Sequence, residues 1–130
     1  MDDGEPLTGL PGMLGIRVTR VDAGGVEAAL VTNELHLVPG ASHVHAGAVV
    51  ALADTACGVG CRAALPVDAN GFLTLELKSN HLKAAKPGDE LVCMATPAHL
   101  GRRTHIWDAV VNLGAGTRPI ALFRCTQLVL

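Results

Sequence analysis

Residues 43–60 read HVHAGAVVALADTACGVG, and Asp54 is the only charged residue in this run after the two histidines. The longer stretch over residues 46–65 is apolar on nearly every face of a helix, and Pro66 follows it. This pattern predicts one long helix over residues 46–65, buried nearly all round. A lone carboxylate is costly to bury among apolar side chains, so Asp54 is either held by a structural neighbour or used in chemistry.

Runs of alternating apolar and polar residues lie on both sides of this helix and predict β-strands. Turns that contain glycine or proline separate the runs. Residues 1–13 hold two prolines and three glycines, which predicts an irregular or partly ordered N-terminal arm with room for one helical turn, ahead of one domain over residues 14–130. The predicted strands cover residues 14–21, 26–32, 72–82, 90–99, 104–113 and 120–130.

One long central helix wrapped by a curved antiparallel sheet of about six strands is an α+β arrangement. So few strands cannot cover an all-apolar helix on every side. The uncovered side therefore predicts a second subunit, and we expect a homo-oligomer.

The overall composition argues against a nucleic-acid partner. The chain has 130 residues, a net charge of −2 and no basic run, and its aromatic residues are one Trp and two Phe. Nucleic-acid binding depends on clustered positive charge and often on aromatic stacking, so neither route is favoured.

The predicted helix does not favour a membrane span either. Its uncharged part is shorter than the ~20 residues that a span needs, and Asp54 interrupts it. The acidic N-terminus, residues 1–5, does not resemble a signal peptide, and the four cysteines show no CxxC spacing. We therefore expect a cytoplasmic protein with reduced cysteines.

A resemblance to a known family appears when the motifs are placed in order. His45-Ala-Gly47, followed by Leu52-Ala-Asp54-Thr-Ala, resembles the HGG…LAD signature of hotdog-fold acyl-CoA thioesterases, in the group that includes the phenylacetate-degradation thioesterases. The resemblance covers roughly residues 14–130. Three further pieces are similar to positions in that family, namely residues 74–78, residues 83–89 and Gly101-Arg102.

The resemblance implies a helix inside a curved sheet, a homodimer with sheets joined edge to edge, and often a dimer of dimers. It implies hydrolysis of an acyl-CoA thioester without a metal and without a cofactor other than the coenzyme A of the substrate. It also implies that His45 shapes the oxyanion end of the site and that Thr74 stands where the family often carries Ser or Thr.

The residue types suit that chemistry. A partly desolvated Asp54 can activate a water molecule or attack the thioester directly. The first N–H groups of a helix lack internal partners, so those of Ala46 and Gly47 can stabilise an oxyanion. The guanidinium groups of Arg102 and Arg103, beside Gly101, suit coenzyme A phosphates, and Lys83 is a weaker candidate.

Helix geometry separates these groups. Ala46 and Asp54 are eight residues apart, a rise of about 12 Å, yet both must approach within ~3 Å of the reacting atoms. The carboxylate of one subunit and the helix start of another solve this problem, which predicts two equivalent sites per dimer.

One departure from the family leaves alternatives open. Pro39 stands where the family often has Asn or Gln, so the chain lacks that side-chain amide. The alternatives are a hotdog protein that binds acyl-CoA without hydrolysing it, a hotdog hydratase or dehydratase, and a metal-dependent enzyme that uses His43 and His45. No further metal ligand stands near that histidine pair in sequence, so we expect no metal.

Overall fold

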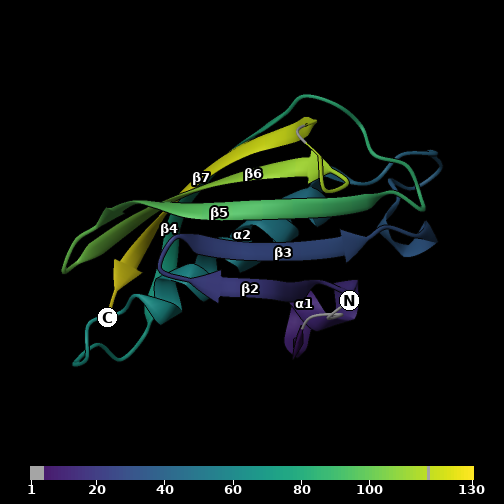
Figure 1. Ribbon diagram of the computed structural model, residues 1–130. Coiled ribbons are helices and arrows are strands. Elements are labelled where there is room, and N and C mark those ends of the chain that lie inside the picture. The colour runs from purple at the N-terminus through teal and green to yellow at the C-terminus, as the bar shows by residue number, and fades with distance from the viewer. Residues whose placement is uncertain (1–4, 117) are drawn as a thin grey trace.

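The computed structural model describes residues 5–116 and 118–130, which fold around one long helix (Figure 1). That helix is α2, Ala46–Ala63. Two short helical segments precede it, α1 (Gly9–Leu14) and the 3₁₀ turn η1 (Glu34–His36). The strands are β1 (Glu5–Pro6), β2 (Arg17–Asp22), β3 (Gly25–Val31), β4 (Phe72–His81), β5 (Glu90–Leu100), β6 (Thr104–Leu113) and β7 (Pro119–Val129).

All strands join one antiparallel sheet in the order β1-β2-β3-β5-β6-β7-β4. The sheet curves around α2, and the helix crosses its inner face (Figure 1). The α+β prediction is therefore confirmed, with the two-residue β1 as an addition to the six expected strands. The predicted helix ends two residues early because the chain leaves the helical conformation at Ala64, before Pro66.

The described part of the N-terminal arm packs against the rest of the fold. β1 pairs with β2, and α1 contacts α2. Gly15 ends α1 in the left-handed conformation, at φ 85°, where glycine is the residue with no steric penalty. The arm thus reaches the side of α2 that the sheet leaves open.

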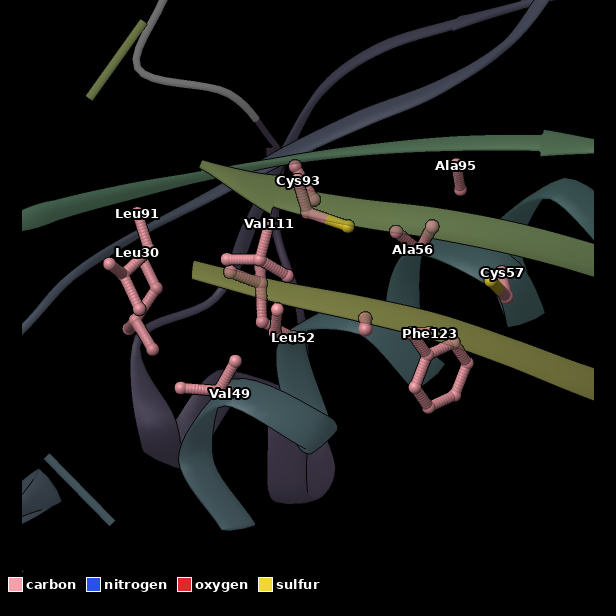
Figure 2. Packing of buried hydrophobic residues seen from close by; sticks show 14 of the residues in the cluster. Leu30, Val49, Leu52, Ala56, Cys57, Leu91, Cys93, Ala95, Val111 and Phe123 are labelled. Carbon is pink, nitrogen blue, oxygen red and sulfur yellow. The ribbon is translucent and has the colours of Figure 1, made fainter. Parts of the chain in front are cut away.

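The core lies between one face of α2 and the sheet (Figure 2). Leu52, Ala56 and Cys57 are fully buried against residues of β5, β6 and β7. Gly60 continues this face where the indole of Trp107 passes so close that a Cβ on Gly60 would lie 2.5 Å from it. The small residues of the helix therefore permit close helix–sheet packing, and each large apolar side chain buried there contributes about 1.5–3 kcal/mol.

The opposite face of α2 is only partly covered, which corrects the expectation of a helix buried all round. Val50, Asp54, Gly58 and Val59 are half-buried, whereas the buried positions all belong to the sheet-facing side. By length and composition alone α2 could span a membrane, with a mean hydropathy of 1.2, but its packing on the sheet is that of a core helix.

All four cysteines are free and buried. Burial raises the pKa of Cys61 to about 11 and that of Cys93 to about 12. The hydrogen bond from the Cys57 thiol to Cys125, together with burial, raises the pKa of Cys57 as well.

A β-bulge in β4 changes which of its side chains face the helix. The register shifts between Thr74 and Glu76, so that Thr74 lies opposite the buried Gln127 and Leu77 lies opposite the buried Cys125. Directly opposed residues share a face of the sheet, so Thr74 and Leu77 both face inward. Simple alternation along residues 72–82 would have placed these two side chains on opposite faces.

Candidate active site

The start of α2 is built by His45, which is the N-cap residue. The ring Nδ1 of His45 accepts a hydrogen bond of 2.7 Å from the Gly47 N–H. The Ala46 N–H, which comes first in the helix, makes no hydrogen bond within residues 5–116 and 118–130. The helix start therefore offers one free amide, where the sequence led us to expect two.

The bond to Gly47 also fixes the protonation of the His45 ring. A neutral imidazole has one donor and one acceptor nitrogen, and Nδ1 is the acceptor here. The proton then lies on Nε2, which is left as a hydrogen-bond donor in a residue that lines the same pocket as Ala46.

A pocket of about 450 Å³ opens at this end of the helix. His45, Ala46 and Lys83 line it together with His43 and His81. Lys83 lies in the loop after β4, so the structure brings three of the predicted site residues to one hollow. Gly47 does not line that pocket; its amide holds the His45 ring instead.

Asp54 lies in a second pocket, also of about 450 Å³, on the open face of α2. Burial raises the pKa of its carboxyl above the ordinary value of 3.8, and a hydrogen bond from Thr74 partly offsets this effect. The Thr74 Oγ1 lies 3.5 Å from the Asp54 Oδ1, which is the outer limit of a hydrogen bond. The structure thus brings Asp54 and Thr74 together.

The rest of this second pocket is mixed: apolar residues line it together with Thr8, Thr55 and Arg62. Asp54, Gly58 and Arg62 follow one another at four-residue intervals along one face of the helix. The guanidinium of Arg62 lies 5.4 Å from the centroid of the Phe72 ring. The absence of a side chain on Gly58 leaves the space between the carboxylate and this ring open.

The remaining predicted residues lie elsewhere. Arg102 and Arg103 line a third hollow, of about 340 Å³, with Pro66 and Asp68 beyond the end of α2. Gly101 forms the tight turn before them, where an added Cβ would lie 2.9 Å from the carbonyl oxygen of Thr104. Within a single chain these arginines therefore share no pocket with Asp54 or with the helix start.

The sequence did not single out several residues of the Asp54 pocket. Leu7 and Pro11 come from the N-terminal arm, and Phe72 comes from the start of β4. Nothing in their local pattern predicts contact with residue 54. Gln127 did carry a signal, because it is a polar residue at a position that alternation along β7 assigns to the inner face.

Comparison with known proteins gives matches along most of the chain. The model of the thioesterase superfamily matches residues 41–119. The putative esterase ComA2 of Bacillus subtilis is 32% identical over 122 residues, which is 90% of this chain and 90% of that protein. The putative esterase PA1618 of Pseudomonas aeruginosa is 33% identical over 121 residues, or 90% of this chain and 79% of that one.

Solved structures give the same picture. A variant of the thioesterase PA1618 from Pseudomonas aeruginosa, in which one Gln is replaced by Ala, superimposes with a TM-score of 0.85 at 26% identity and covers 93% of this chain and 85% of its own. The PaaI protein from the phenylacetic acid degradation operon of Escherichia coli has a TM-score of 0.82 at 23% identity, covering 92% of this chain and 83% of its own.

Proposed function

Because the chain belongs to the thioesterase superfamily and has its hotdog fold, we propose that it hydrolyses the thioester of an acyl-CoA to free coenzyme A and a carboxylic acid. The observation that carries this proposal is the Asp54 carboxylate, half-buried in a pocket beside the Thr74 hydroxyl, where burial raises its pKa. A carboxylate in such a place has a raised proton affinity, which suits a general base.

The proposed reaction needs two copies of the chain. The pocket at the helix start and the pocket at Asp54 share no residue, and about 12 Å of helix separates Ala46 from Asp54. A second copy with its helix antiparallel to the first brings the helix start of one subunit to the carboxylate of the other. The half-exposed face of α2 and the edge strand β4, with its exposed Leu73, Leu75 and Leu77, support this contact.

At each site Asp54 removes a proton from the attacking water, and the developing oxyanion accepts hydrogen bonds from the partner chain's helix start. The donors are the free N–H of Ala46 and the Nε2–H of His45, which the Gly47 amide holds in place. The tetrahedral intermediate then collapses, the C–S bond breaks, and coenzyme A leaves as the thiol with the proton that Asp54 took from the water. Lys83 of one subunit and Arg102 and Arg103 of the other bind its phosphates, and the acyl group occupies the pocket over Gly58.

The proposal includes no metal and no cofactor apart from the coenzyme A of the substrate. It also includes a homodimer, assembled further into a dimer of dimers, in the cytoplasm. The four free cysteines are in keeping with a reducing compartment.

The test of the proposed function is thiol release from a panel of acyl-CoA thioesters, with aryl and medium-chain aliphatic acyl groups. We expect catalytic release from at least one member. Because burial raises the pKa of Asp54, the rate should fall on acidification at a pH above 3.8. Tight binding with no thiol release across the panel would contradict hydrolysis and favour an acyl-CoA sensor or carrier, in keeping with Pro39 in place of a side-chain amide.

Charge reversal at Arg102 tests the placement of coenzyme A. Arg102→Glu should raise KM for acyl-CoA by about 5- to 30-fold with a smaller change in kcat, since a charged hydrogen bond to phosphate holds substrate and transition state alike. Arg20→Glu is the matched control, because Arg20 lies on β2 and lines none of the three hollows. A loss confined to kcat would mean that Arg102 acts in the chemistry and not in binding.

A further inference from the structure

Gln127 is a polar residue on the buried inner face of the sheet. It lies on β7 between Thr74 of β4 and His105 of β6, directly opposite both in the register, and its side chain is fully buried. A buried side-chain amide is costly unless both of its ends have partners. The position of Gln127 therefore needs an explanation that packing alone does not provide.

Both ends of the Gln127 amide have hydrogen-bond partners, and one of these partners, Thr74, lines the Asp54 pocket. The carbonyl Oε1 accepts a hydrogen bond of 2.9 Å from the Thr74 hydroxyl. The Nε2 donates to the sulfur of Cys125 over 3.3 Å. The contact with Cys125 favours the amide orientation in which the carbonyl, and not the NH₂ group, faces Thr74.

Thr74 has one hydroxyl proton and two acceptors nearby. The distance to the Gln127 carbonyl is 2.9 Å, whereas the distance to the Asp54 carboxylate is 3.5 Å. Because a single proton cannot form a good hydrogen bond to both, the shorter contact takes it. The hydroxyl thus points mainly at the buried amide, and its longer contact with Asp54 offsets only part of the effect of burial on the pKa of that carboxyl.

We propose that Gln127 is a positioning residue whose buried carbonyl holds the Thr74 proton away from Asp54 and so keeps that carboxylate a stronger base. The inference rests on the proposed function in one respect, since the base is put to use only if Asp54 acts on a thioester. Gln127 touches no reacting atom and acts through Thr74.

The ionisable groups around Asp54 do not supply the same effect. Among the described residues, Cys57 on α2 and Cys125 on β7 interact electrostatically with Asp54, and Arg62 lines the same pocket. β4 contributes Thr74 and Phe72 to that pocket, and the N-terminal arm contributes Leu7, Thr8 and Pro11, none of which is ionisable. Because Gln127 also bonds Cys125, the Thr74→Val background is needed to separate the effect of the Thr74 hydroxyl from an effect through that thiol.

The experiment replaces Gln127 with Met, which has a similar length and no acceptor oxygen for the hydroxyl. Thr74 is then free to donate to Asp54, and a hydrogen bond to the charged form of a carboxyl favours ionisation. We expect Asp54 to titrate at a lower pH in Gln127→Met than in the wild type. Carboxyl ¹³C NMR of the aspartate-labelled protein measures this directly, with Asp54→Asn identifying the resonance.

The same change should alter the pH dependence of hydrolysis. The acid limb of the kcat/KM profile should move to lower pH. At a pH below the wild-type limb, the variant should therefore retain a fraction of its own plateau rate that is about two to five times the fraction retained by the wild type. The plateau itself should fall about two- to fivefold, because Asp54 is then a weaker base.

Two further variants separate positioning from a structural role. In the Thr74→Val background, Gln127→Met should produce no further shift, because its effect passes through the hydroxyl. Val111→Ala, a core truncation on β6, should lower the free energy of unfolding without moving the titration of Asp54. Gln127→Asn, whose shorter amide cannot reach Thr74, replaces Gln127→Met if the latter does not fold.

The outcomes are distinguishable. An unmoved titration in Gln127→Met, a shift to higher pH, or an equal shift in the Thr74→Val background would each overturn the role of Gln127. The protein could also show the expected NMR shift but release no thiol from any acyl-CoA. That result would support the effect of Gln127 on Asp54 and refute the proposed hydrolysis.

Discussion

Asp54→Asn should lower kcat for thioester hydrolysis by about 10²- to 10⁴-fold, which is the usual contribution of a general base. Asparagine keeps the shape of the side chain and its contact with Thr74 but cannot accept the proton of the attacking water. The measurement is thiol release under saturating substrate on the acyl-CoA that gives the highest wild-type rate. Asp22→Asn, at the exposed end of β2, is the matched control and should retain full activity.

The loss should not come from unfolding. Burial raises the pKa of Asp54, so ionisation of this carboxyl lowers the free energy of unfolding as the pH rises through that pKa. Asparagine carries no such charge, and the melting temperature of the variant at neutral pH should therefore equal or exceed that of the wild type. Full activity in a folded Asp54→Asn protein would refute the central role given to this residue.

Ala46→Pro should lower kcat by about 10²- to 10³-fold, the usual effect of removing one oxyanion donor. Proline lacks the backbone N–H, and the first position of a helix tolerates it because that group has no partner inside the helix. His45, with φ −62° and ψ 134°, already has the extended conformation favoured before proline. The substitution thus deletes one donor and leaves the backbone path unchanged.

Ala46→Gly is the matched control, since it keeps the N–H and removes only a methyl group; its rate should stay within about twofold of the wild type. Equal activity of Ala46→Pro and Ala46→Gly would mean that the free amide takes no part in catalysis.

Mixing the two inactive proteins tests the shared site. After random exchange of subunits in equal amounts, half of the dimers are mixed, and each mixed dimer has one site with both an intact Asp54 and an intact helix start. About a quarter of the wild-type activity should return. Mass spectrometry can show whether the subunits have exchanged. A mixture that has exchanged and is still inactive would contradict a site built from two chains.

The sequence was sufficient for most of the fold because its local signals agree with one another. The long run of small apolar residues ended near Pro66, the turns fell at glycines and prolines, and every predicted strand has its counterpart in the sheet. The family resemblance singled out both Asp54 and Thr74, and the structure places the Thr74 hydroxyl 3.5 Å from the Asp54 carboxylate.

The features that the sequence did not predict depend on contacts between distant segments. The bulge after Thr74 is set by the register of β4 against β7, and no local pattern in β4 marks it. The contact between the N-terminal arm and the Asp54 pocket depends on tertiary packing. The bond that occupies the Gly47 amide depends on the rotamer of His45, which backbone reasoning about helix starts leaves undetermined.

The buried cysteines have a practical consequence for measuring this chemistry. Aromatic disulfide reagents report free coenzyme A by reacting with thiolates, and the thiolate is the reactive form of cysteine. Every cysteine of the folded chain is buried, and burial raises the pKa of Cys61 and Cys93 far above neutrality. The protein should therefore contribute almost no colour of its own, and a slow background that appears on warming would report exposure of its core.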